Sequence, residues 1–95
     1  MAAFAIFIKN STKDPQELAT YSKKAGAARG DHPITPLVYY GPLEVLEGDP
    51  AEGVVLLQFP DMAAAHAWYD SPAYQDAKAH RLRGADYRVI LAQGL

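Results

Sequence analysis

The sequence predicts a two-layer α+β domain, and three observations support this class. Four stretches are rich in Phe, Ile, Val and Leu and are bounded by turn-forming residues, as strands are. Two other regions begin with a capping residue and continue with good helix formers. In chain order these regions give β-α-β-β-α-β. The chain has 95 residues, which is room for one small core, so we predict a single domain over residues 1–95.

The first strand and the first helix follow from local composition. Ala3–Lys9 is a compact run rich in Phe and Ile and is expected to be a strand. Asp14 is followed by Pro15, which suits the first helical position, and by Glu17, which can reach back to the cap. We therefore expect a helix from Asp14 to about Ala28. Its inner stripe would hold Leu18, Tyr21, Ser22 and Ala25.

Two further strands are expected in the middle of the chain. Ile34–Leu46 is rich in β-branched and aromatic residues but is interrupted by Gly41-Pro42. Proline removes a donor from the sheet, so this strand should be bent, bulged or at an edge. Glu47–Pro50 has the composition of a tight connection, and Gly53–Phe59 is the clearest strand of the chain. The two strands should form a hairpin.

The region from Phe59 to Arg81 is predicted to form two short helices that break at Ser71-Pro72. Asp61 caps the first helix, and Ser71 caps the second with proline at its first position. A last strand is expected over Tyr87–Ala92. The order is that of a ferredoxin-like α+β domain, a four-stranded antiparallel sheet with helices on one face. One face of the second helix would hold Tyr74, Ala77, Lys78, Arg81 and Leu82.

The strands are apolar on both faces, which predicts a homodimer. The stretches FAIFI, VVLLQF and VILA do not alternate between apolar and polar residues. Helices can cover one face of the sheet, and the other would remain as a large apolar patch, which monomers rarely tolerate. A second copy of the chain is the simplest cover. A terminus folded over the patch is the alternative.

The composition of the chain limits the binding partners and the cellular location that we expect. The formal charge is −2 and the basic residues are scattered, so no nucleic-acid interface is expected. The chain has no cysteine, which excludes disulfides and thiolate catalysis and agrees with a reducing compartment. The N-terminal MAAFAIFIK lacks a basic region and is too short for a membrane span. We expect a cytoplasmic protein without membrane association.

Several motifs resemble those of the family catalogued as domain of unknown function 1330. They are AxAWYDSPAYQ at Ala65–Gln75, the following Arg81, LEG at Leu46–Gly48, and the apolar strand before Gln93-Gly94. The resemblance covers nearly the whole chain. It implies the dimeric α+β barrel superfamily, in which two ferredoxin-like sheets pack face to face and whose members include small monooxygenases and isomerases. Arg29–Pro33 departs from the Gly-Gly pair usual in the family, and the resemblance assigns no catalytic residue.

Arg81 is the first candidate for a functional side chain, because the face that it shares with Tyr74 should point at the sheet. A partly buried guanidinium needs a carboxylate, a carbonyl or an anionic ligand. A structural ion pair, for example with Glu47, and a surface position are the alternatives. Glu47 and His66 are the other catalytic candidates, Glu47 as a proton carrier at a strand end.

Other polar and aromatic residues could complete a site. His66 and Asp70 stand four apart on a helix, but a third metal ligand is missing, so no metal is predicted. His32 is expected in a polar loop and His80 on a solvated helix face, and either could act as an acid or base if a pocket formed beside it. The candidate substrate-binding residues are Tyr40, Trp68, Tyr69, Tyr74 and His32.

Three classes of function are compatible with these observations. The resemblance and a possible Arg/Glu/Tyr pocket favour a cofactor-free, monooxygenase- or isomerase-like enzyme that acts on a small organic acid or aromatic compound. The absence of an evident nucleophile or metal set favours a ligand-binding module without chemistry. A purely structural homodimer would need no pocket.

Overall fold

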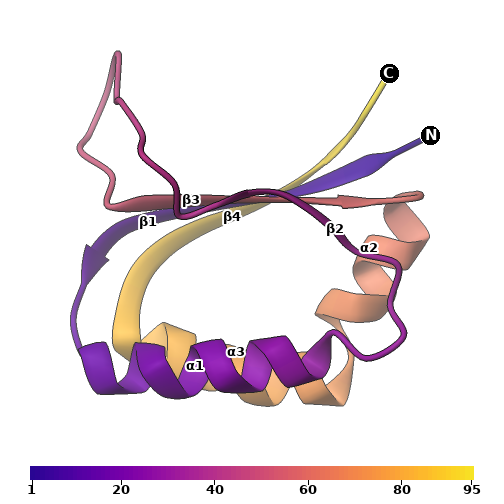
Figure 1. The fold of residues 1–95 in the computed structure, drawn as a ribbon, viewed down its shortest axis with the longest axis horizontal. Helices are drawn as coiled ribbons and strands as arrows, with labels where there is room; N and C mark the ends of the chain where they lie inside the picture. Colours follow the sequence, from indigo (N-terminus) through magenta and orange to yellow (C-terminus); the bar gives the residue numbers. More distant parts are fainter.

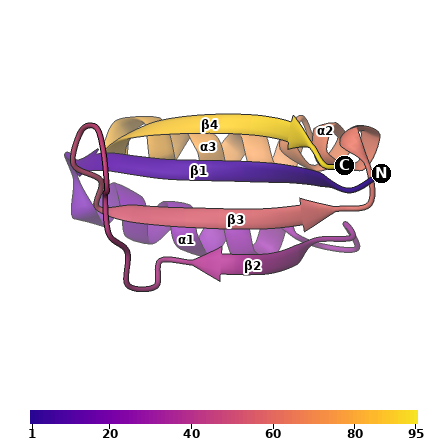
Figure 2. The ribbon, with the colours of Figure 1, turned by 90° about the horizontal axis from the view of Figure 1, so that it is seen from above.

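The computed structural model describes all residues from Met1 to Leu95 and has an antiparallel sheet with three helices packed on one of its faces (Figure 1). Its elements are β1 (Ala3–Thr12), α1 (Pro15–Ala28), β2 (Thr35–Tyr39), β3 (Gly53–Phe59), α2 (Met62–Tyr69), α3 (Pro72–Gly84) and β4 (Ala85–Gln93). The strand order is β2-β3-β1-β4, and β1 is paired on both sides (Figure 2). This confirms the predicted ferredoxin-like fold.

Side-chain caps define the helix starts, as the sequence predicted. An Asp14 carboxylate oxygen accepts hydrogen bonds from the backbone N–H groups of Gln16 and Glu17. Asp61 accepts from Ala64 N at 2.7 Å, and Ser71 Oγ accepts from Tyr74 N at 3.3 Å. The break between α2 and α3 is therefore confirmed. The break turns the chain so that α3 lies beside α1 on the same face of the sheet.

The first prediction to be corrected concerns Glu17. It does not close a capping box with Asp14, because its carboxylate lies 2.7 Å from His80 Nδ1 and 3.5 Å from Arg83 Nε on α3. The contact links the two long helices. His80 is accordingly half-buried at the helix interface, where the sequence had suggested a solvated face.

The strand register separates two apolar faces of the sheet. Ala5 pairs with Leu57 and Phe7 pairs with Val55, and these four side chains are buried under the helices. Ile6, which pairs with Leu56, belongs to the opposite face. The residues of that face are only half-buried because no element covers them, and they include Phe4, Ile6, Ile8, Val54 and Leu56.

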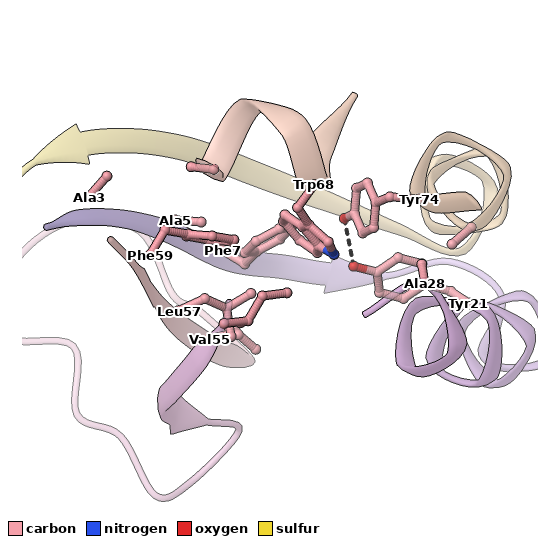
Figure 3. Close-up of a cluster of buried hydrophobic side chains, with 13 residues drawn as sticks. Ala3, Ala5, Phe7, Tyr21, Ala28, Val55, Leu57, Phe59, Trp68 and Tyr74 are labelled. Atoms are coloured by element: carbon pink, nitrogen blue, oxygen red, sulfur yellow. Dashed lines mark hydrogen bonds between the residues drawn. The ribbon is translucent and has the colours of Figure 1, made fainter. Parts of the chain in front are cut away.

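Trp68 lies at the centre of the core (Figure 3). Its ring centroid is 4.2 Å from that of Tyr74, 5.5 Å from that of Phe59 and 6.2 Å from that of Phe7. Phe59 and Tyr74 are the largest fully buried side chains. These contacts join β1, β3, α2 and α3, so the helix break and the aromatic core support each other.

The second predicted strand is shorter than expected. It ends at Tyr39, just before Gly41-Pro42, and the tight connection at Glu47–Pro50 is part of a longer loop over residues 40–52. The backbone leaves the strand at Tyr40, whose φ is 54°. From there the loop projects from the sheet on the side opposite the helices (Figure 1).

The predicted inner face of α3 was wrong at one position. Tyr74, Ala77 and Arg81 are buried as expected, but Leu82 is largely exposed. The face continues instead to Gly84, where a Cβ would come within 2.9 Å of the Leu18 side chain. The close contact between α1 and α3 therefore requires glycine at this position.

Candidate functional site

Arg81 is the one charged residue of the buried core. It is 4% exposed, it makes no ion pair, and its Nε has no hydrogen-bond partner. Its guanidinium carbon lies 5.3 Å from the ring centroid of Tyr87 and 5.8 Å from that of Phe7. A buried cation without a carboxylate is unusual, because removing its charge from water costs several kcal/mol, and only a close, well hydrogen-bonded counter-ion offsets that cost.

Four tyrosines surround this arginine in two hydrogen-bonded pairs. Tyr21 Oη of α1 lies 2.8 Å from Tyr74 Oη of α3 (Figure 3), and Tyr40 Oη lies 2.5 Å from Tyr87 Oη of β4. Burial raises the pKa of all four hydroxyls, and the Arg81 charge opposes that increase in each case. The tyrosines therefore stay protonated near neutral pH and can serve as hydrogen-bond donors.

Two cavities adjoin the tyrosines between α1 and the sheet. The first has a volume of about 170 Å³ and a mainly apolar wall that includes Phe7, Ile34, Val55, Leu57 and Trp68. The second has about 230 Å³ and is lined by Lys9, Leu18, Tyr21, Ser22, Tyr40 and Tyr87. Both cavities share Tyr21, Ser22 and Tyr40, so they form adjacent compartments of one site. Arg81 lies behind the tyrosines and lines neither cavity.

A second unpaired donor faces this region. Trp68 Nε1 is buried and has no hydrogen-bond partner. Figure 3 shows the nitrogen side of the indole turned toward the Tyr21–Tyr74 pair. Buried polar groups are almost always paired. Trp68 lines the first cavity, so its unpaired Nε1–H indicates a site for an acceptor there. Arg81 Nε is also unpaired, but Arg81 lines neither cavity.

The charged residues that line the cavities are all cationic. Arg29 lines the first cavity and donates from Nη2 to the Ile34 carbonyl oxygen at 2.7 Å. Lys9 lines the second, with its Nζ 5.4 Å from the Tyr40 ring centroid and 4.0 Å from a carboxylate oxygen of the exposed Glu52. No carboxylate or imidazole lines either cavity. The field at the site therefore favours a negative ligand.

The structure gathers some of the residues that the sequence singled out and separates others. Trp68 and Tyr40 line the cavities. Tyr74 and Arg81 line neither cavity, but each contacts a tyrosine that does, Tyr74 through Tyr21 and Arg81 through Tyr87. Tyr69 is half-buried behind them, with its ring centroid 5.2 Å from that of Tyr74.

The remaining predicted residues lie elsewhere. Glu47 is exposed in the loop on the opposite side of the sheet, so it neither pairs with Arg81 nor reaches the cavities. His66 is exposed on α2, 3.8 Å from Asp70, and no third ligand-type side chain joins them. His32 lines a separate shallow groove beside the start of α3. These three positions are not part of the site that we propose.

Sequence reasoning did not single out Tyr21, Tyr87 or Lys9 as site residues. Tyr21 was placed on the inner stripe of its helix and Tyr87 at the start of the last strand. Both carry hydroxyls whose partners are distant in the sequence, 53 and 47 residues away. No pattern of residues close together in the sequence predicts such pairs. Lys9, at the end of an apolar run, could have been noticed as a cation directed to one face of the sheet.

The topology and the two-layer architecture define a ferredoxin-like α+β domain. The sequence matches the family described as Domain of unknown function (DUF1330) over residues 2–95, and the chain belongs to that family. The search of curated proteins found no match.

Solved structures of similar fold include two of unknown function. A protein from Rhodopseudomonas palustris aligns with a TM-score of 0.75 at 18% identity, over 99% of this chain and 82% of its own. A dimeric ferredoxin-like protein from Jannaschia sp. CCS1 aligns with a TM-score of 0.72 at 13% identity, over 99% and 100%.

A third similar structure has a known activity. SnoaB, a cofactor-independent oxygenase from Streptomyces nogalater, aligns with a TM-score of 0.66 at 12% identity, over 99% of this chain and 92% of its own. At sequence identities this low, the similarity to these structures concerns the fold alone. None of the three helices in the present chain has the length and apolar character to cross a membrane.

Proposed function

We propose that the protein binds a small organic anion in the cavities between α1 and the sheet. The observation that carries this proposal is the buried guanidinium of Arg81, which has no carboxylate partner and is surrounded by protonated tyrosines. A carboxylate, phenolate or enolate oxygen at the tyrosine hydroxyls would accept their hydrogen bonds. The Arg81 charge behind them would stabilise the bound anion.

The dimensions of the first cavity define the body of the ligand. An apolar cavity of about 150 Å³ accommodates benzene. The first cavity, with about 170 Å³ and walls of Phe7, Val55 and Leu57, is therefore suited to a single ring or a short branched chain. The acid group of such a ligand would lie toward Tyr21 and Tyr40, which the two cavities share. The ligand class is a small aromatic or aliphatic acid.

A second candidate function is cofactor-free catalysis on such a ligand. Preorganised donors in a site that excludes water stabilise an enolate or other oxyanion that develops in a transition state. Arg81, Trp68 and the tyrosines form an array of this kind. A protein of similar fold is a cofactor-independent oxygenase, which is compatible with this second function. A purely structural role would explain neither the cavities nor the unpaired donors.

We propose that the functional unit is a homodimer. The sheet face that carries Ile6 and Leu56 is apolar and uncovered, and the loop over residues 40–52 projects on the same side (Figure 1). Leu46, in this loop, is 87% exposed. A second copy packed on this face would bury these side chains. Structures of similar fold are described as dimeric, which supports the proposal.

Thermal shift with a panel of small aromatic and aliphatic acids tests the proposed binding. We expect at least one acid to raise the melting temperature of the wild type. Arg81→Met should lose the stabilisation, because the cation behind the tyrosines is gone. Arg83→Met is the matched control, since Arg83 is exposed on the same helix. If no acid stabilises the wild type, or if Arg81→Met responds equally, the proposed binding is wrong.

A further inference from the structure

The site offers hydrogen-bond donors but no base. The titratable residues that line the two cavities are tyrosines together with Arg29 and Lys9. From the elements packed around Arg81, the facing titratable groups are Tyr21 of α1, Tyr40 after β2, Tyr74 of α3 and Tyr87 of β4. The histidines and carboxylates lie outside the cavities. Nothing in this set is suited to remove a proton from a neutral ligand near neutral pH.

The donors outnumber the acceptors that the protein supplies. Each tyrosine pair has two O–H protons, and its internal hydrogen bond uses one of them, which leaves one proton per pair for a ligand. Trp68 Nε1–H and Arg81 Nε–H are also unpaired. A neutral ligand of the same shape would leave the Arg81 charge uncompensated. An anion supplies lone pairs to the tyrosine protons and to the N–H of Trp68, which lines the first cavity. Its charge also compensates that of Arg81, which lines neither cavity and acts on the ligand through its charge.

We infer that the site selects ligands that are already ionised in water, namely carboxylic acids and acidic phenols or enols, and that the protein holds the anion without having deprotonated the ligand. This inference rests on the proposed binding function and narrows its ligand class. It excludes neutral alcohols, amides and weakly acidic phenols of the same size. It also assigns Trp68 a role as a donor to the anion, in addition to its role in the core.

The charge state of a bound ligand is directly observable with 4-nitrophenol, because its phenolate and phenol forms absorb at different wavelengths. A cation close to an ionisable group lowers that group's pKa by about 1–3 units. We expect the wild type to lower the apparent pKa of bound 4-nitrophenol by about 1 unit or more, a preference of tenfold or more for the anion. Arg81→Met should abolish the shift, and Arg83→Met should retain it.

Benzoate and benzamide give a second test that needs no variant. They have the same shape and differ in charge, so benzoate should bind at least about tenfold more tightly, the ratio that corresponds to one pKa unit. An unchanged or raised apparent pKa for 4-nitrophenol, or equal binding of benzamide, would overturn the inference and leave the proposed binding intact. If neither 4-nitrophenol nor benzoate binds, both this inference and the proposed binding are wrong.

Discussion

Replacing Arg81 by methionine separates a ligand-binding role from a structural one. Methionine keeps the unbranched apolar stem and removes the guanidinium. Replacement of buried ionic groups by hydrophobic residues of similar volume is often neutral or stabilises by about 1–4 kcal/mol. The variant loses the contacts of Arg81 with Phe7 and Tyr87, at 5.8 and 5.3 Å. Both distances are near the upper limit of about 6 Å for this interaction, so we take about 0.5–1 kcal/mol for each contact, less than the roughly 2 kcal/mol of a close, desolvated pair.

The gain from removing the buried charge and the loss of the two ring contacts nearly cancel. We expect the free energy of unfolding of ligand-free Arg81→Met to lie between about 2 kcal/mol below and about 3 kcal/mol above that of the wild type. A structural ion pair would behave differently, because removing one partner of a buried pair costs about 3–5 kcal/mol. The two roles of Arg81 therefore predict clearly different stabilities.

Urea unfolding followed by the fluorescence of Trp68, the single tryptophan, gives this free energy. Protein concentration must be held constant, because dimerisation would contribute to the apparent stability. Arg83→Met is the control and should change the value by about 1 kcal/mol or less, as expected for an exposed ion pair with Glu17. A loss of about 3 kcal/mol or more in Arg81→Met would show that Arg81 has an internal structural role, and the argument for a ligand would be wrong.

Three further predictions concern the core, the dimer and the tyrosines. Trp68→Ala should lose about 3–5 kcal/mol of stability, and an unchanged melting temperature would contradict the proposed core. Leu56→Glu places a charge on the uncovered sheet face and should give monomeric, unfolded or aggregated protein by light scattering, whereas we expect a dimer for the wild type. Because burial raises the pKa of Tyr21 above its ordinary value of 10.0, the folded state holds the proton more tightly. The contribution of Tyr21 to stability is therefore constant below its ordinary pKa of 10.0 and is lost above it, as the unfolded chain ionises first. Tyr21→Phe should weaken the loss of stability in alkaline urea titrations.

The parts of the fold that depend on contacts between residues close together in the sequence could be predicted from it. Asp14, Asp61 and Ser71 cap helices through bonds that span two or three residues. The burial of Tyr74 and Arg81 on one face follows from helical spacing. The lack of alternation in the strands correctly indicated a sheet with two apolar faces.

The site itself depends on long-range packing, which spacing does not encode. The hydroxyls of Tyr40, which follows β2, and Tyr87, on β4, meet although β2 and β4 are opposite edges of the sheet with β3 and β1 between them. Glu47 was expected near Arg81 because it follows a predicted strand. The strand ends at Tyr39 instead, and the loop carries Glu47 to the other side of the sheet. The path of a long loop after a residue with positive φ is set by tertiary contacts.

The central claim is that the cavities beside Arg81 bind a small organic anion, and a crystal structure with 4-bromobenzoate tests it most directly. The anomalous signal of bromine locates the ring without ambiguity. We predict a bromine peak in the apolar cavity beside Val55 and Leu57, with the carboxylate accepting hydrogen bonds from the tyrosine hydroxyls in front of Arg81. An empty cavity in crystals soaked at saturating ligand, with Arg81 paired to a carboxylate of the protein or of a second copy, would contradict the claim.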